Sequence, residues 1–292
     1  MTSRVAVLGA GNMAGAMVGT LRRAGFDVVV WNRTQARGEA VAATHGATAA
    51  PTATEAMANA EVVLSSLADD EAVLATYLGD EGAASACGPD HVVLEMSTIA
   101  PDTARRVGEA VTASGAAFLD APVSGSVPTV EKGELTIMVG GDAATLERAR
   151  PVLDALAAKI FHVGVLGAGA TVKLAVNALV HAIDVGLSEA LVLAEKAGVD
   201  RSAAYDVFAA GAAAAPFVLY KRPAFEDPDH AQLTFTLDLM AKDLDLILSL
   251  AREVDAPMGQ AERNREVVER ALIGGFSGRD MSAVAEYLRR PG

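Results

Sequence analysis

Cysteine, basic residues and histidine are scarce in this chain of 292 residues. Cys87 is the sole cysteine, which excludes an internal disulfide and any multi-cysteine metal site and fits a reducing cytoplasm. Lysine and arginine number 24 against 37 acidic residues, and the net charge of -13 argues against nucleic-acid binding, which needs clustered basic side chains. The five histidines show no metal-ligand spacing, so we predict no metal site. These scarcities favour a cytoplasmic protein that works without a metal or a nucleic-acid partner.

A clean membrane-spanning run is also missing. The longest apolar stretch, residues 174–194, is interrupted by polar residues that a membrane span would rarely carry together: Asn177, His181, Asp184, Ser188 and Glu189. The first four residues leave no room for a signal peptide before the apolar run that starts at Val5. A hydrophobic content of 51% is ample for the core of one large or two ordinary domains. We therefore expect no membrane contact.

A glycine-rich turn near the start is the first positive signal. An apolar run over residues 4–8 is typical of a buried strand, the sequence Gly9-Ala-Gly11-Asn12-Met13-Ala14 follows at once, and helical spacing extends over residues 17–24. Strand, glycine turn and helix in this order place backbone N–H groups and the positive end of a helix where a pyrophosphate can bind. Ala14 stands where a third glycine is common, and that position serves helix–strand packing. The turn predicts a dinucleotide site.

The end of the next strand, over residues 27–31, indicates which dinucleotide binds. An NAD-binding fold usually has an acidic residue there, which accepts hydrogen bonds from the ribose hydroxyls. This chain has Asn32-Arg33-Thr34 instead. An arginine and a hydroxyl remove the repulsion from a 2′-phosphate and supply charge-assisted hydrogen bonds to it, so we expect NADP(H).

Strands and helices alternate over about the first 160 residues, which predicts a doubly wound parallel sheet of six or more strands. Further strands are expected at 47–50, 61–65, 91–95, 117–119, 134–139 and 159–163, and helices at 35–45, 54–59, 71–78, 101–114 and 145–157. The loops Ser65-Ser66-Leu67-Ala68 and Met96-Ser97-Thr98 follow strand ends and should border the ligand crevice. We place the domain boundary after residue 163, with an all-helical second domain over 164–292.

Two further stretches carry chemistry. The loop Asp120-Ala-Pro-Val-Ser124-Gly125-Ser126 offers N–H and hydroxyl donors that can hold a carboxylate, although a plain turn would use the same residue types. In the stretch from Gly167 to Asn177, a long apolar helix starts, with Lys173 and Asn177 four residues apart on one face. A buried lysine there would exchange protons near neutral pH, because desolvation favours its neutral form.

Four motifs in this order resemble the β-hydroxyacid dehydrogenase family over almost the whole chain. They are the Gly9 turn, Asp120 to Gly125 with the glycine-rich 133–141, Gly169-x-x-x-Lys173-x-x-x-Asn177, and Lys242-Asp243. This family includes 3-hydroxyisobutyrate dehydrogenase, tartronate semialdehyde reductase, glyoxylate/succinic semialdehyde reductase and, more distantly, 6-phosphogluconate dehydrogenase. The resemblance implies a Rossmann domain followed by an all-α domain that a long interdomain helix enters, and a homodimer or higher oligomer formed through the helical domain.

The resemblance also implies the roles of residues. Lys173 would be the general acid and base with Asn177 as its amide partner, Ser124 and Gly125 would hold the substrate carboxylate, Thr98 would lie near the nicotinamide, and Phe235 and Asp243 would close the pocket. The residues expected to contact the cofactor are Gly9, Gly11, Asn12, Met13, Asn32, Arg33, Thr34, Ser66, Leu67, Thr98 and Lys242.

The expected reaction is hydride transfer between NADPH and a small carboxylate-bearing aldehyde or β-hydroxy acid, of the glyoxylate, succinic semialdehyde or 3-hydroxyisobutyrate type. Ser126 and the Asn-Arg-Thr sequence resemble the NADPH-dependent semialdehyde reductase branch. An imine reductase with the same fold and cofactor is one alternative, and a non-catalytic cofactor-bound interaction protein is another. Lys173 and Ser124 favour the hydroxyacid reaction over both.

Overall fold

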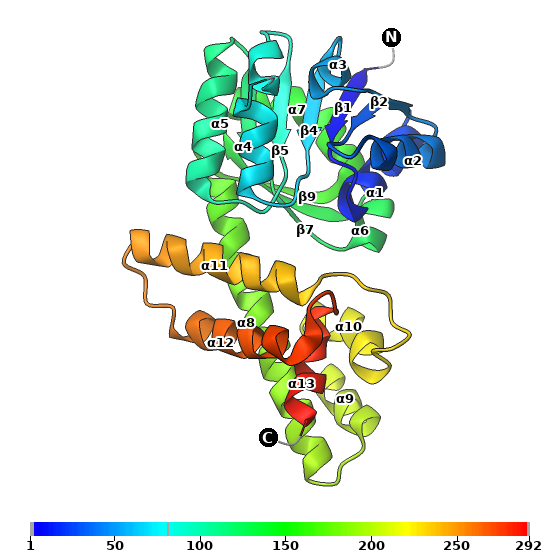
Figure 1. Cartoon of the computed structure of the whole chain (residues 1–292), viewed down its shortest axis with the longest axis vertical. Coiled ribbons are helices and arrows are strands. Elements are labelled where there is room, and N and C mark those ends of the chain that lie inside the picture. The colour runs from blue at the N-terminus through cyan, green and yellow to red at the C-terminus, as the bar shows by residue number, and fades with distance from the viewer. Residues whose placement is uncertain (1–2, 81, 291–292) are drawn as a thin grey trace. The chain divides into compact units, whose positions relative to one another are not determined.

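The computed structural model of the chain describes residues 3–80 and 82–290. It divides into two compact units, Met1–Lys173 and Leu174–Gly292 (Figure 1). The first unit combines strands and helices, whereas the described part of the second is helical apart from one isolated bridge between Thr236 and Asp280. Each unit has its own hydrophobic core.

The strands of the first unit form one mixed sheet. Nine are described: β1 (Arg4–Leu8), β2 (Asp27–Trp31), β3 (Thr48–Ala49), β4 (Val62–Ser65), β5 (Val92–Glu95), β6 (Ala117–Asp120), β7 (Val123–Ser124), β8 (Leu135–Gly141) and β9 (Ala157–Gly164). The helices between them are α1 (Asn12–Arg23), α2 (Gln35–His45), α3 (Ala53–Met57), α4 (Asp70–Leu78), the 3-10 turn η1 (Ala83–Ala86), α5 (Pro101–Ala113), α6 (Val127–Glu131) and α7 (Ala143–Leu156).

Six strands are parallel in the order β3-β2-β1-β4-β5-β6, which is the order of a doubly wound dinucleotide-binding sheet. The predicted parallel sheet is confirmed for this part. The register aligns the last residues of four strands, namely Leu8, Ser65, Glu95 and Asp120. Register partners point to the same side of a sheet, so these four side chains form a row at its carboxyl edge.

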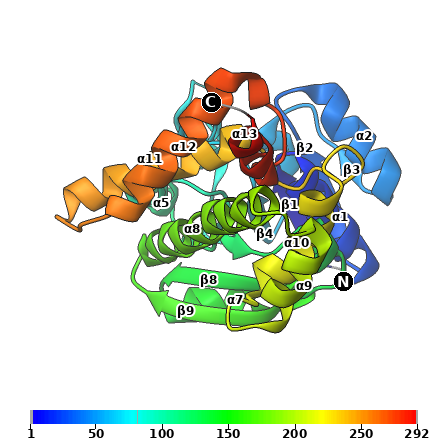
Figure 2. The ribbon, with the colours of Figure 1, turned by 90° about the horizontal axis from the view of Figure 1, so that it is seen from below.

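The remaining strands correct the prediction of an all-parallel sheet. β8 runs antiparallel to β6 and to the two-residue strand β7, and then pairs in parallel with β9, as Figure 2 shows for β8 and β9. β7 and α6 were not predicted, because both are short and the segment from Asp120 to Glu131 that contains them has no hydrophobic periodicity. β8 continues to Gly141, beyond the strand predicted over 134–139, and α1 starts at Asn12, ahead of the helical spacing over 17–24.

Both faces of the sheet are covered. The alternation within β1 sends Val5 and Val7 to one side and Ala6 and Leu8 to the other. The Val5 side packs with α1, α6 and α7, and the Leu8 side packs with α3, α4 and α5. Because helices cover both faces, the carboxyl ends of the strands are the part of the sheet where a ligand can bind.

The helices of the second unit follow α8 (Ala168–Lys196), which starts in the first unit. They are α9 (Arg201–Ala210), α10 (Pro216–Glu226), α11 (Leu237–Glu253), α12 (Gly259–Ala271), the π turn η2 (Leu272–Phe276), the 3-10 turn η3 (Met281–Ala283) and α13 (Val284–Arg289). By length and composition alone α8 could cross a membrane. Its buried positions nevertheless include Asn177, His181, Asp184 and Ser188, as is usual for a core helix of a packed domain.

A buried ion pair fixes the segment before α11. The Lys221 ammonium lies 2.5 Å from Asp280 and donates to the Thr234 hydroxyl at 2.7 Å. Asp280 also accepts from the backbone N–H groups of Thr234 and Phe235, and the Met281 N–H donates to the Phe235 carbonyl. Lys221 is only 3% exposed, so the pair depends on complete hydrogen bonding to offset its desolvation.

Asp184 faces the same pair from α8. Its side chain is fully buried, and neither carboxyl oxygen has a hydrogen-bond partner among the described residues. Burial raises the pKa of Asp184 well above its usual range, the nearby Lys221 opposes this rise, and Asp280 adds to it. One ammonium thus lies near two carboxyl groups, and only Asp280 holds it directly, so Lys221 only partly opposes the rise in the pKa of Asp184.

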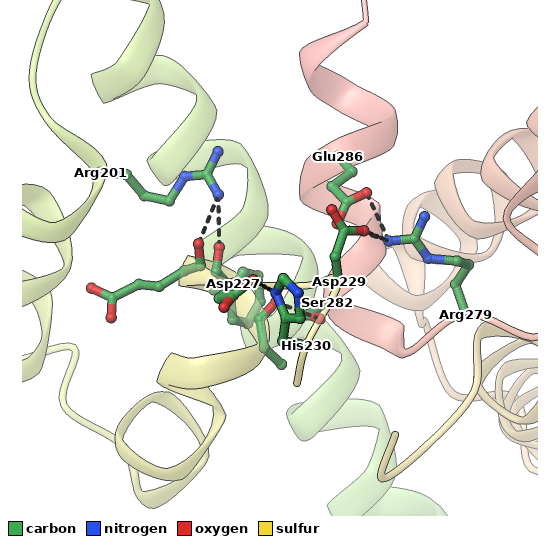
Figure 3. Close-up of polar contacts among 10 residues, drawn as sticks. Arg201, Asp227, Asp229, His230, Arg279, Ser282 and Glu286 are labelled. Atoms are coloured by element: carbon green, nitrogen blue, oxygen red, sulfur yellow. Dashed lines mark hydrogen bonds and ion pairs between the residues drawn. The ribbon is translucent and has the colours of Figure 1, made fainter. Parts of the chain in front are cut away.

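Exposed ion pairs lie farther out on the second unit. The Arg279 guanidinium lies 3.0 Å from Glu286 and 3.5 Å from Asp229. Figure 3 shows these contacts and His230 beside Asp227. Such pairs are solvated and contribute little individually to stability.

Replacement of the buried cation should therefore cost far more than replacement of an exposed one. Lys221→Met leaves Asp280 without its counter-charge, and we expect the free energy of unfolding to fall by about 3–5 kcal/mol. Arg263→Met is the control, because Arg263 pairs with Glu266 on an exposed face and should cost less than about 1 kcal/mol. Urea unfolding of both variants tests this, and equal losses would contradict the assigned role of Lys221.

Candidate cofactor and active site

The glycine turn after β1 has a conformation that requires glycine. Gly9 has a φ of 119°, and a Cβ atom there would collide with the carbonyl oxygen of Ser66. The turn therefore lies directly against the end of β4, where Ser66 also donates its N–H to Leu8. Gly11 precedes α1 and has no side chain that could cap the helix. The first N–H groups of α1 are thus suited to a phosphate.

Asn32 ties the end of β2 to this turn. Its side-chain oxygen accepts from the Ala10 N–H at 3.1 Å, and its amide donates to the Thr34 carbonyl at 3.0 Å, with the amide orientation assigned from these bonds. Arg33 and Thr34 beside it are exposed. Asn32 therefore orders the loop, while its two neighbours can reach a ligand.

A buried carboxyl group joins the ends of β4 and β5. Glu95 is fully buried, and it lies 2.5 Å from the Ser65 hydroxyl and accepts from the Ser97 N–H at 2.8 Å. The Tyr77 hydroxyl donates to Ser65 at 2.8 Å. Burial raises the pKa of Glu95 to about 7, although the hydrogen bonds from Ser65 and Ser97 oppose that rise.

The two loops that follow these strands are also joined. The Ser97 hydroxyl accepts from the Leu67 N–H at 2.8 Å, and Asp70 at the start of α4 accepts from the Ala100 N–H at 2.9 Å. Ser66 and Leu67 on one loop, and Thr98 on the other, are thereby held at the same edge of the sheet as Gly9. The structure places these predicted cofactor residues together in the first unit.

The predicted carboxylate loop includes β7. Ser124 is half-buried and pairs with Thr136 of β8. Gly125 has a φ of 148°, and a Cβ atom there would lie 2.7 Å from the Leu135 side chain, so only glycine fits. Ser126 then begins α6 and donates its N–H to the Thr129 hydroxyl at 3.2 Å.

Asp120, at the end of β6, anchors α8 and had no predicted role. Its carboxylate accepts from the backbone N–H groups of Gly167 at 2.8 Å and Ala170 at 2.7 Å. Burial raises the pKa of Asp120, and the N–H donors of Gly167 and Ala170 oppose that rise. A Cβ atom on Gly169 would lie 2.5 Å from the Met138 carbonyl oxygen, which explains the glycine four residues before Lys173. The start of α8 is thus fixed against the sheet.

Asn177 lies one turn beyond Lys173 on α8 and belongs to the second unit. Its amide donates to Asp243 of α11 at 2.6 Å, and the Lys242 ammonium lies 3.0 Å from the other oxygen of Asp243. Burial would raise the pKa of Asp243, but His181 and Lys242 outweigh it and hold that pKa below its usual value. Asp243 is only 1% exposed and serves here to orient Asn177.

His181 is a member of this group that our sequence reasoning did not assign. It lies four residues after Asn177 on the same face of α8 and is 2% exposed. Its Nε2 atom is 3.8 Å from Asp243, and its ring centroid is 6.0 Å from that of Phe235. The spacing from Lys173 to Asn177 to His181 could have indicated it. The structure thus brings Asn177, Phe235, Lys242 and Asp243 together in the second unit.

A doubly wound sheet whose glycine turn opens a helix, together with polar loops at its carboxyl edge, defines a dinucleotide-binding oxidoreductase. Comparisons with known proteins specify the class further. Residues 4–164 match the NAD-binding domain of 6-phosphogluconate dehydrogenase, and residues 167–288 match the NAD-binding region of NADP-dependent 3-hydroxyisobutyrate dehydrogenase. The chain belongs to the β-hydroxyacid dehydrogenase family, whose members use a nicotinamide cofactor.

Relatives cover nearly the full length. Glyoxylate/succinic semialdehyde reductase 1 of Arabidopsis thaliana is 32% identical over 98% of both chains, and 3-hydroxyisobutyrate dehydrogenase of Pseudomonas aeruginosa is 36% identical over 98% of both. An NAD-dependent L-serine dehydrogenase of Pseudomonas aeruginosa is 35% identical over 96% of both. Among solved structures, the Mycobacterium tuberculosis 3-hydroxyisobutyrate dehydrogenase with L-serine has a TM-score of 0.85 at 32% identity, covering 99% of this chain and 100% of that one.

The role of Asp120 can be tested through stability. Asp120→Ala leaves two buried N–H groups at the start of α8 without their acceptor, and we expect a loss of about 2 kcal/mol or more in the free energy of unfolding. Asp142→Ala removes the cap of α7, which accepts from Thr145 on the surface, and should cost only about 1 kcal/mol. Urea unfolding compares them. A smaller loss of unfolding free energy for Asp120→Ala than for Asp142→Ala would contradict the role of Asp120 in fixing the start of α8.

Proposed function

We propose that this chain is an NADP(H)-dependent reductase of small carboxylate-bearing aldehydes, with Lys173 as the general acid and base. The observation that carries the proposal is the loop after β2, where Asn32 is engaged with Ala10 and leaves Arg33 and Thr34 exposed. A positive charge and a hydroxyl at this position suit a 2′-phosphate, and a carboxylate that would repel it is missing from Asn32-Arg33-Thr34. Names of relatives alone do not decide the cofactor, since one is an NAD-dependent enzyme.

The chain's residues fit such a cofactor. The Gly9 turn against Ser66 and the free first turn of α1 suit the pyrophosphate. Leu67 and Thr98, on loops that Ser97 and Glu95 join, would border the nicotinamide. Bound NADPH would supply the hydride.

The protein residues would handle the substrate and the proton. The Ser124 hydroxyl and the Gly125 N–H would hold the substrate carboxylate through hydrogen bonds. The Lys173 ammonium would donate a proton from Nζ to the substrate oxygen as the carbonyl is reduced, and neutral Lys173 would take it back in the oxidation. Asn177, oriented by Asp243, would help to place that oxygen.

The loop that contains Ser124 and Gly125, together with the names of relatives, supports the proposed type of substrate. Glyoxylate and succinic semialdehyde both have a carboxylate that Ser124 can hold, and a relative is named for their reduction. An imine reductase of a Pseudomonas species has a TM-score of 0.66 at 20% identity, a likeness that concerns the fold alone. Initial rates with glyoxylate, succinic semialdehyde, 3-hydroxyisobutyrate, L-serine and a cyclic imine test the class, and reduction of the imine alone would overturn it.

Removal of the Lys173 ammonium should abolish proton transfer. We expect Lys173→Met to lower kcat by a factor of about 100 to 10,000 while the Kd for NADPH changes little, because only the acid is lost. Lys196→Met is the control, since Lys196 is exposed at the other end of α8. Steady-state kinetics and NADPH fluorescence titration measure both effects. Near-normal turnover by Lys173→Met would refute the assignment.

The Arg33 side chain should set the cofactor preference. Arg33→Gln loses charge-assisted hydrogen bonds to the 2′-phosphate, so the Kd for NADPH should rise about 10- to 100-fold and the Kd for NADH should stay nearly constant. Arg106→Gln, an exposed change on α5, should alter neither. Parallel titrations of each variant with NADPH and with NADH measure both dissociation constants. An equal effect on both cofactors would rule out 2′-phosphate recognition by Arg33.

A further inference from the structure

Glu95 is a buried ionisable group that the proposed mechanism does not use. It ends β5 and holds both flanking loops: one through the Ser65 hydroxyl at 2.5 Å, and the other through the Ser97 N–H at 2.8 Å. Ser97 in turn accepts from the Leu67 N–H at 2.8 Å. Glutamine could make most of these contacts, so hydrogen bonding alone does not account for an acid here.

The surrounding hydroxyl groups can accommodate either protonation state. When Glu95 is ionised, Tyr77 donates to Ser65 and Ser65 donates to the carboxylate. When Glu95 is protonated, its own O–H can donate to Ser65, whose hydrogen can turn toward the Leu94 carbonyl oxygen at 3.5 Å. The heavy atoms need not move between the two arrangements. Titration therefore changes the charge beneath the loops and leaves their positions unchanged.

Among the described ionisable groups that face Glu95, none other is expected to titrate near neutral pH. Tyr77 of α4 stays neutral, because burial raises its pKa well above the usual value, and Cys87 near Tyr77 has its pKa raised to about 11 by burial. Asp70, also on α4, is a negative neighbour that adds to the high pKa of Glu95. Asp120, the register partner on β6, is engaged by the start of α8.

We propose that Glu95 is a positioning residue of the cofactor site whose negative charge favours the oxidised over the reduced nicotinamide cofactor. The proposal rests on the proposed function, which places the nicotinamide beside Leu67 and Thr98. The nicotinamide ring is cationic when oxidised and neutral when reduced, and the rest of the cofactor is the same. A buried carboxylate at the end of β5 attracts only the oxidised ring, and little water screens it.

The direction of the effect follows from the titration. Protonated Glu95 at low pH does not discriminate between the two forms, whereas ionised Glu95 at high pH binds NADP+ more tightly relative to NADPH. The ratio of the Kd for NADPH to the Kd for NADP+ should therefore rise between pH 6 and pH 8.5, by on the order of fivefold. Ionisation of the 2′-phosphate affects both forms equally and cancels in the ratio.

The experiment measures both dissociation constants by isothermal titration calorimetry across this pH range, without substrate. Wild type should show the rise, Glu95→Gln should show a flat ratio, and the exposed control Glu109→Gln on α5 should behave as wild type. Asp70→Asn removes the negative neighbour, so it should keep the rise and move its midpoint to lower pH. A flat ratio in wild type, or an unchanged rise in Glu95→Gln, would overturn the proposal.

Thermal unfolding without cofactor supplies a second readout. The native pKa of Glu95 is about 7 against a usual 4.5, so the folded state retains a proton that the unfolded state has lost. Its contribution to stability is complete below pH 4.5 and is lost as the pH rises through 7. The Tm of wild type should thus fall more than that of Glu95→Gln between pH 5.5 and pH 8. Equal decreases in Tm would show that Glu95 does not titrate in this range and would overturn the proposal. Absence of any NADP(H) binding would instead refute the proposed function.

Discussion

The capture of the N–H groups at the start of α8 by Asp120 is the interaction that fixes this end of the helix against the sheet of the first unit. Lys173, Asn177 and His181 recur at intervals of four on α8 and therefore share one face. The glycine at position 169 is part of the same constraint, because the helix begins in contact with the backbone of β8. The motif that starts at Asp120 and the motif that starts at Gly169 look independent in the sequence, but they contact each other at the start of α8.

Four buried carboxyl groups show how this protein sets charge by local partners. Asp243 has an amide and an ammonium, and its pKa is held below the usual value, whereas Asp120 has backbone N–H donors that only oppose the rise in its pKa. Asp184 has no hydrogen-bond partner among the described residues, and burial raises its pKa well above the usual range. Glu95 resembles Asp120, because hydroxyl and N–H donors only partly offset the effect of burial on its pKa. Burial is similar in all four, and the number and charge of the donors separate their behaviour.

The sequence predicted the parts of the fold that short-range patterns encode. The alternation of strands and helices gave the six parallel strands, and the glycine turn gave the start of α1 within a few residues. It could not give the antiparallel β8, because strand direction depends on pairing between distant segments. Asp120 and Glu95 look like ordinary polar residues at strand ends, and their roles appear only when register aligns them with Ser65 and with the start of α8.

The choice between NAD and NADP illustrates why family membership leaves chemistry open. Relatives of similar identity have names that refer to different substrates and cofactors, so overall similarity does not discriminate between them. On the proposed function, a preference for a 2′-phosphate would rest on the residues at the end of β2. There Asn32 accepts a hydrogen bond from the Ala10 N–H, and the exposed Arg33 would supply the charge. The hydrogen bonds of Asn32 hold the loop, so the two exposed side chains beside it, rather than the overall fold, would determine which cofactor the loop can bind.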